Sequence, residues 1–184
     1  MDVVDVAKLG FTSLNITFNI VIFALYVVAS VLKNHKLKFI LYWVTVILAS
    51  IVKVLQYIAI IFAIRHEKFV ITVTDIILLY LTHIILFNSA INLAYMKDNG
   101  AYNIENSNKP GKKPSEFLDL LYYTFVTSFT IGYGDISPHN VASKLIFLIH
   151  SIDSYILFVF FISMFTKMLT DVPFIFNYSP KSSV

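Results

Sequence analysis

The sequence predicts an all-α membrane protein with four transmembrane helices and one short helix that enters the membrane without crossing it. Of the 184 residues, 58% are hydrophobic and 14% are charged, whereas a soluble domain carries about 25% charged residues. Four apolar segments are long enough to cross a hydrocarbon core, which requires about 20 helical residues. These segments are residues 11–32, 39–64, 69–96 and 141–169.

The first apolar segment is too long for the core of a signal peptide and has no obvious small-residue cleavage site, so we expect it to span the membrane. Residues 97–114 are polar and contain Gly and Pro, which predicts a solvent-exposed loop. A short helix is expected over residues 115–128, because Pro114 and Ser115 favour a helix start and Glu116 and Asp119 follow in the first turns. The predicted domains are a two-helix membrane region, 1–66, and a second module, 67–184.

Residues 130–135 read Thr-Ile-Gly-Tyr-Gly-Asp and directly follow this short helix. A ribbon whose successive carbonyls point the same way needs alternate residues in conformations that are cheap mainly for glycine, and Gly132 and Gly134 have that spacing. A ring of such carbonyls from several chains can replace the hydration oxygens of a cation. The helix before it would direct its partially negative carboxyl end at the ion. The alternative, a glycine-rich turn between two helices, does not explain this context.

Residues 121–138, Leu-Tyr-Tyr-Thr-Phe-Val-Thr-Ser-Phe-Thr-Ile-Gly-Tyr-Gly-Asp-Ile-Ser-Pro, resemble the pore loop of tetrameric and two-pore-domain potassium channels. The resemblance extends over about residues 69–169 and implies an outer helix, a pore helix, a selectivity filter and an inner helix. It also implies that Asp135 lies just outside the filter and meets Tyr122 of the pore helix. The residues that it assigns to K+ coordination are Thr130, Ile131, Gly132, Tyr133 and Gly134.

Three residues depart from the pattern of this family. Tyr122 stands where many relatives have Trp, although a tyrosine hydroxyl can also donate to a carboxylate. Phe129 stands where Thr is common. Ser154 occupies the inner-helix position where relatives often have the glycine that lets the helix bend, and a serine can ease a bend by bonding back to the helix backbone.

One filter sequence per chain predicts a homotetramer in the lipid bilayer, because four copies are needed to close a ring of carbonyls. The function that this implies is passive, selective conduction of K+. Two alternatives are a non-conducting accessory subunit of a channel and a potassium transporter subunit. Such transporters typically carry several degenerate repeats with a single glycine each, whereas this chain has one complete Gly-Tyr-Gly.

Two ionisable residues, Lys53 and Asp153, lie well inside apolar segments, where a charge is costly and therefore a candidate for function. Asp153 either faces a water-filled cavity and concentrates cations, or is buried against polar groups of the outer helix, such as His83, Asn88 or Asn92. His150 shares its helix face, three residues away. Lys53 either has a role in permeation or pairs with a carboxylate or a polar pocket between helices.

Four spans with the filter facing outward place both termini in the cytoplasm. Lys33, Lys36 and Lys38 then lie outside, which the positive-inside rule disfavours; the alternative is an N-terminal segment that lies in the interface. The sequence has no cysteine, which excludes disulfides and thiolate metal sites. It also has no motif of a nucleotide-binding, zinc-dependent or serine-dependent enzyme. We therefore expect no enzymatic activity, no cofactor and no nucleic-acid partner, with K+ as the permeant ion.

Overall fold

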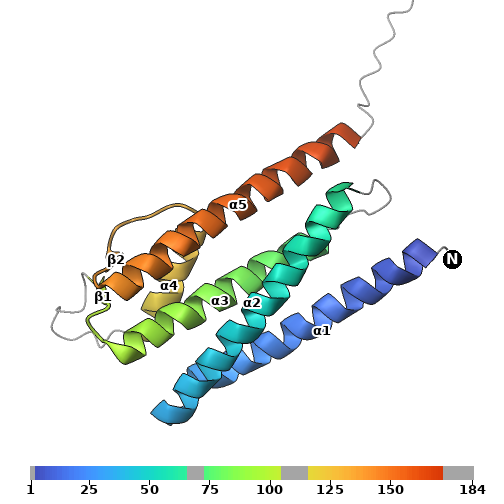
Figure 1. Ribbon diagram of the computed structural model, residues 1–184. Coiled ribbons are helices and arrows are strands. Elements are labelled where there is room, and N and C mark those ends of the chain that lie inside the picture. Colours follow the sequence, from blue (N-terminus) through green and yellow to red (C-terminus); the bar gives the residue numbers. More distant parts are fainter. Residues whose placement is uncertain (1–2, 66–72, 105–115, 172–184) are drawn as a thin grey trace, which may run out of the picture.

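A computed structural model describes residues 3–65, 73–104 and 116–171 of the chain (Figure 1). Four of its helices are long and apolar enough to cross a membrane, which confirms the predicted all-α membrane fold. Between the third and the last of them lie a shorter helix and two short strands. In chain order the helices are α1 (Val3–Val31), α2 (His35–Arg65), α3 (Val73–Lys97), α4 (Glu116–Ser128) and α5 (Val141–Asp171).

A three-residue connection joins α1 to α2 and makes the two helices antiparallel neighbours. Asn34 begins α2, because its side-chain oxygen accepts a hydrogen bond from the backbone N–H of Leu37 at 3.2 Å, as a helix N-cap does. This turn lies toward the same end of the bundle as the strands and the C-terminal end of α3 (Figure 1). Lys33, Lys36 and Lys38 are therefore on that side, as the predicted four-span topology requires.

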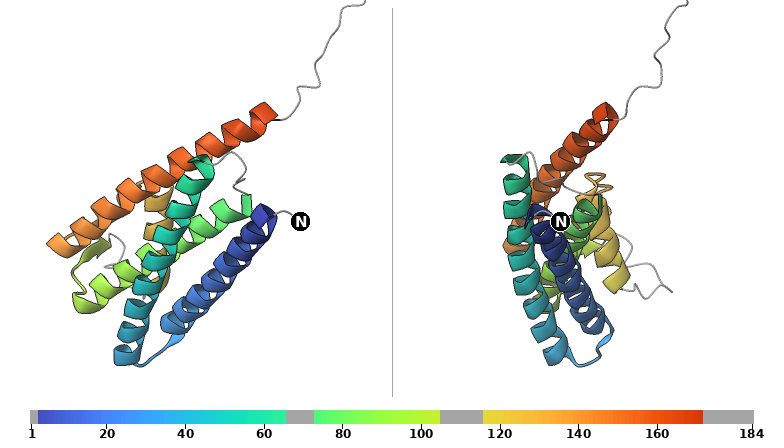
Figure 2. Two further views of the ribbon diagram at one scale, coloured as in Figure 1. Left: turned by 45° about the vertical axis from the view of Figure 1, so that its right-hand side comes forward. Right: turned by 90° about the vertical axis from the view of Figure 1, so that its right-hand side faces the viewer.

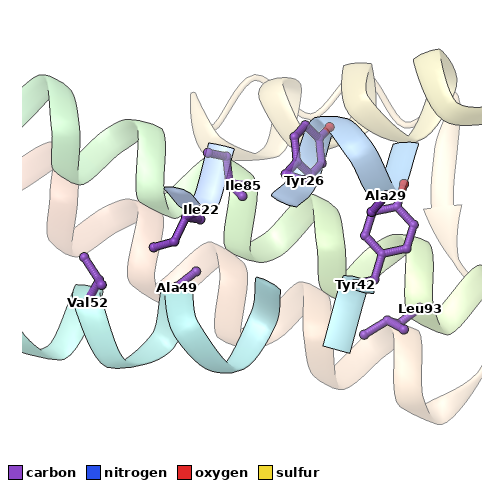
Figure 3. Packing of buried hydrophobic residues seen from close by; sticks show 8 residues of the cluster. All are labelled: Ile22, Tyr26, Ala29, Tyr42, Ala49, Val52, Ile85 and Leu93. Atoms are coloured by element: carbon purple, nitrogen blue, oxygen red, sulfur yellow. The ribbon is translucent and has the colours of Figure 1, made fainter. Parts of the chain in front are cut away.

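Helix α3 is the centre of the bundle. It contacts α1, α2, α4 and α5 and lies between α1 and α5 (Figure 2). An apolar cluster joins α1 and α2 to α3 (Figure 3), and in it Ala29 and Ala49 are both fully buried. Alanine at such positions lets helix backbones approach closely. The other buried members are Ile22, Tyr26, Tyr42, Val52, Ile85 and Leu93.

Buried amides add hydrogen bonds to this packing. Gln56 of α2 donates to the side-chain oxygen of Asn15 in α1 at 2.8 Å, and Asn19 donates to the same oxygen at 3.0 Å. Thr82 of α3 donates to Asn19 at 2.6 Å. Because a polar group in hydrocarbon must find a partner within the protein, this network fixes how α1 and α2 dock on α3.

The prediction that residues 97–114 form a solvent-exposed loop is wrong for Ala101 and Tyr102, which are buried. Strand β1 (Tyr102–Ile104) pairs antiparallel with β2 (Ile136–Pro138), which follows the filter sequence. The Tyr102 ring also packs on Tyr123 of α4, with centroids 5.4 Å apart. The pairing was missed because its two strands are short and more than thirty residues apart. Residues 105–114 lie outside the described residues.

Asp98 links the end of α3 to the start of α5. Its carboxylate accepts a hydrogen bond from the Asn140 amide at 2.8 Å and another from the backbone N–H of Gly100 at 2.9 Å. Asn140 in turn caps α5 by accepting from the Ser143 N–H at 2.8 Å. These bonds hold the pKa of Asp98 below its usual value, and the bond from Asn140 has the largest effect.

We predict that Asp98→Asn lowers the melting temperature of the detergent-solubilised protein at pH 7 and that the difference from the wild type vanishes in acid. Since the pKa of Asp98 is lower in the folded state, the ionised carboxylate stabilises the fold above its unfolded pKa of about 3.9. That stabilisation is lost as the pH falls through the folded pKa. Thermal unfolding of both proteins across pH 3–7 measures it.

The matched control is the same substitution in an Asn140→Ala background, where the effect of Asp98→Asn should shrink because the main donor is gone. A difference between wild type and Asp98→Asn that stays constant down to pH 3 contradicts the prediction.

Candidate functional site in the pore loop and the bundle interior

The short helix α4 ends in a motif that leads directly into the predicted filter. The backbone N–H of Ile131 donates to the carbonyl of Val126 at 2.9 Å, and that of Thr130 donates to the carbonyl of Thr127 at 3.0 Å. This pair of bonds is a Schellman motif, whose left-handed residue is usually glycine. Here that residue is Thr130, with φ at 56°, so the first predicted filter residue is also the cap of α4.

Positive φ angles alternate along the segment. They occur at Thr130, at Gly132 with 59° and at Gly134 with 80°, but not at Ile131 or Tyr133. This alternation is what a ribbon with successive carbonyls on one side needs. The two glycines are at the predicted positions, but the conformation of Thr130 was not predicted. A β-branched residue at positive φ is unusual and costs about 1–3 kcal/mol.

The segment is exposed when one chain is considered alone. The side chains of Ile131 and Tyr133 are 53% and 68% exposed, and in the described part of the chain no backbone hydrogen bond involves residues 132–134. Their carbonyls thus have no backbone partner within the described part of the chain. Among the described residues no cluster of His, Cys, Asp or Glu could hold a metal.

Aromatic residues brace both ends of the segment. Tyr122 of α4 lies parallel to Tyr133, with centroids 6.5 Å apart. At the other end Phe129 stacks on Tyr80 of α3 at 6.2 Å. That Tyr122 meets Asp135 and supports the filter stays a prediction.

The second group of predicted residues meets in the bundle interior, below the filter. Asp153 of α5 forms an ion pair with Lys53 of α2 and lies 2.9 Å from Nδ1 of His83 in α3. The Tyr57 hydroxyl donates to its other carboxylate oxygen at 2.5 Å. Of the two interpretations of Asp153, the structure therefore agrees with contact to polar groups of other helices, including His83 of α3. Lys53 pairs with a carboxylate, that of Asp153. The side chains of Lys53 and Asp153 are 5% and 16% exposed.

The other proposed partners of Asp153 lie elsewhere. Asn88 accepts a hydrogen bond from Tyr26 of α1 at 2.8 Å and donates to Thr124 of α4 at 2.9 Å, and Asn92 donates to Asn88 at 2.9 Å. Through these bonds α1 is joined to α4 by way of α3.

The exposed edge of Asp153 faces a cavity of about 450 Å³ between α2, α3 and α5, which no filter residue lines. Most of its lining is apolar, including Val54, Phe87 and Ile152. Asp153 is therefore directed toward α2 and α3 in this chain.

The hydrogen bonds of Ser154 determine the tautomer of His83. The Ser154 hydroxyl donates to the carbonyl of His150 at 2.7 Å, so it must accept from Nε2 of His83, 3.0 Å away. Nδ1 then accepts from the Lys53 ammonium at 2.6 Å. His83 is neutral in this arrangement, and Lys53 and Asp153 balance each other's charge. The back-bond of Ser154 is the type that the sequence suggested.

His150 makes its main polar contact with a residue that the sequence did not indicate. Its Nε2 lies 2.9 Å from the hydroxyl of Ser128, the last residue of α4. The spacing of His150 and Asp153 placed both on one helix face, but no local pattern indicates a contact with a residue 22 positions earlier. The bond therefore connects the polar interior of the bundle to the residue two positions before the filter.

The family described as ion channel matches residues 76–171, from α3 to the end of α5. Residues of this chain are 47% identical over 36 positions to "Two pore potassium channel a" of Oryza sativa subsp. japonica, which covers 20% of this chain and 10% of that protein. They are 40% identical over 53 positions to "Two-pore potassium channel 2" of Arabidopsis thaliana, which covers 29% of this chain and 10% of that protein. The chain thus matches about a tenth of the length of these relatives. No solved structure matches it.

We predict that Asp153→Leu lowers the free energy of unfolding by about 3–5 kcal/mol, because it leaves the Lys53 ammonium buried without its partner. The double substitution Lys53→Met with Asp153→Leu should recover most of that loss, since well-packed apolar residues can replace a buried ion pair. Denaturant unfolding in detergent micelles measures both. An Asp153→Leu variant as stable as the wild type contradicts the ion pair, and Ser50→Ala on α2 is the control.

Proposed function

Since this chain belongs to the ion channel family, which matches residues 76–171, we propose that it conducts K+ passively and selectively as a homotetramer. The chain is a multi-pass membrane protein, and its family is not one of enzymes. The observation that carries the proposal is the alternation of positive φ at Thr130, Gly132 and Gly134 in a segment where the carbonyls of residues 132–134 have no backbone partner among the described residues.

K+ would bind between successive carbonyls of the segment. Thr130 would add its hydroxyl at the end nearest the bundle interior, where the carboxyl end of α4 also directs partial negative charge. Replacement of the hydration shell by carbonyls is how such filters admit K+. The names of the two plant relatives, both two-pore potassium channels, agree with this choice of ion. The proposed coordinating residues are Thr130, Ile131, Gly132, Tyr133 and Gly134.

Two features support four copies around one pore. Each chain contributes one filter segment, and free backbone groups at membrane depth are tolerated only against protein or water. Moreover, 17% of the apolar window of α5 is buried within the chain, against 56% for α3. The helix proposed as the inner helix is thus less covered by its own chain than the outer helix. Neighbouring copies would cover part of it and close the ring.

Within each subunit we assign residues 67–184 to the pore module and residues 1–66 to a peripheral two-helix region. The hydrogen bonds of Asn19 and Tyr26 to α3 support this arrangement, because they hold α1 on the outer helix. Asp135 and Tyr122 would support the outer end of the filter.

We predict that the purified wild-type protein in a planar bilayer, with K+ on one side and Na+ on the other, reverses near the K+ equilibrium potential. Gly132→Ala should lose the selective current. A Cβ at this position would meet no atom within 4 Å in the same chain, so the loss would come from the φ of +59°, which alanine adopts only with strain.

Gly100→Ala is the control for a glycine outside the filter, because Gly100 does not have a positive φ. Its Cβ would lie 3.2 Å from Oδ1 of Asp98, a side chain that must shift slightly, so this control also shows that such a shift alone leaves the current selective. Equal permeation of both ions by the wild type contradicts selectivity. The absence of any current favours an accessory subunit, and a saturable coupled flux favours a transporter.

We predict four subunits per particle. Protein with one fluorophore per chain, reconstituted at low density, should bleach in up to four steps, with a step distribution that fits four copies. A distribution that fits two copies contradicts the tetramer, and a monomeric membrane protein labelled in the same way calibrates the count.

A further inference from the structure

His150 lies where α5, α3 and α4 meet, and it is fully buried. Its ring stacks on Phe87 with centroids 4.4 Å apart and an interplanar angle of 13°. On another side the ring of His83 lies 5.0 Å away. A ring packed against two other rings has little freedom to turn, so the direction of its nitrogen atoms is set by α3.

The polar contact of this ring has a definite direction. Nε2 lies 2.9 Å from the Ser128 hydroxyl, whereas Nδ1 is buried and has no hydrogen-bond partner in the described part of the chain. An Nδ1–H would be fixed by the packed ring where it has no acceptor, whereas the hydroxyl hydrogen of Ser128 can rotate toward a carbonyl of its own helix. We therefore place the proton on Nε2, so that His150 donates to Ser128.

Ser128 is the last residue of α4 and is itself buried. The Schellman bonds from Thr130 to Thr127 and from Ile131 to Val126 close around it. They hold Thr130 at a φ of 56°, which a threonine does not adopt without strain. A strained residue persists only where the surrounding structure over-determines its conformation. The bond from α5 to Ser128 is one such constraint from outside the loop.

We propose that His150 is a positioning residue for the selectivity filter. By donating to Ser128 it fixes the carboxyl end of the pore helix, and it thereby holds Thr130 in the left-handed conformation with which the filter begins. This inference rests on the proposed function of residues 130–134. It gives α5 a contact with the base of the filter that is separate from any role of Ser154 in bending.

The test compares K+ to Na+ permeability ratios, from reversal potentials, in single and double variants. His150→Leu removes the donor and keeps an apolar side chain against Phe87, and we expect the ratio to fall about fivefold, the equivalent of ~1 kcal/mol for one hydrogen bond. Ser128→Ala removes the same bond from its other side and should give a similar fall. The double variant should fall no further, because both changes remove one interaction.

His150→Gln, which retains a donor, should restore the ratio to within twofold of the wild type, and a merely structural role would not predict this rescue. Ser89→Ala is the control for loss of a buried hydroxyl, because Ser89 has no hydrogen-bond partner among the described residues. If His150→Leu fails to assemble, the permeability ratio of Ser128→Ala alone tests the proposal.

If the wild type is selective for K+ and the variants are equally selective, the role of His150 is overturned and the proposed function is not. A wild type that passes both ions equally overturns the proposed function, and the inference with it. Additive losses in the double variant show that the two residues act separately, which also contradicts the proposal.

Discussion

Hydrogen bonds from one helix, α3, to each of the other four helices are the interactions on which the rest of the structure depends. Thr82 donates to Asn19 of α1, and His83 accepts from Lys53 of α2 and donates to Ser154 of α5. Asn88 binds the pore helix α4 through Thr124. In a bilayer, lipid tails satisfy apolar surfaces as well as protein does, so apolar packing alone selects neighbours weakly. A polar group has far fewer acceptable partners, and those on α3 therefore specify which helix lies where.

The same constraint explains the charge balance in the bundle. A lone Lys53 or Asp153 would be costly in this environment, but the two neutralise each other while His83 and Tyr57 satisfy their remaining bonds. Because the members come from α2, α3 and α5, the cluster can be satisfied only when all three helices are in place. The cluster thus specifies how α2, α3 and α5 are arranged, in addition to stabilising them.

Hydropathy and motif predicted the four long apolar helices, the short helix α4 and the unusual backbone conformation of Gly132 and Gly134, because each of these is encoded by neighbouring residues. Which polar side chains meet was less accessible. The sequence offers His83, Asn88 and Asn92 as possible partners of Asp153 without distinguishing them, and Asn88 and Asn92 bind elsewhere. Lys53 and Asp153 are one hundred residues apart, and no local pattern relates them. The left-handed conformation of Thr130 was not predicted, because threonine disfavours the positive φ that the Schellman motif imposes.

These long-range bonds also determine how the N-terminal helices can influence the pore. Tyr26 of α1 donates to Asn88, and the amide of Asn88 donates to Thr124 of α4, so α1 reaches the pore helix through a single side chain of α3. From the other side, Lys53 of α2 reaches α5 through Asp153, one helical turn from His150. Buried polar groups have few alternative partners in a bilayer. Through these contacts α1 and α2 therefore constrain α4 and α5, the two helices between which the proposed filter lies.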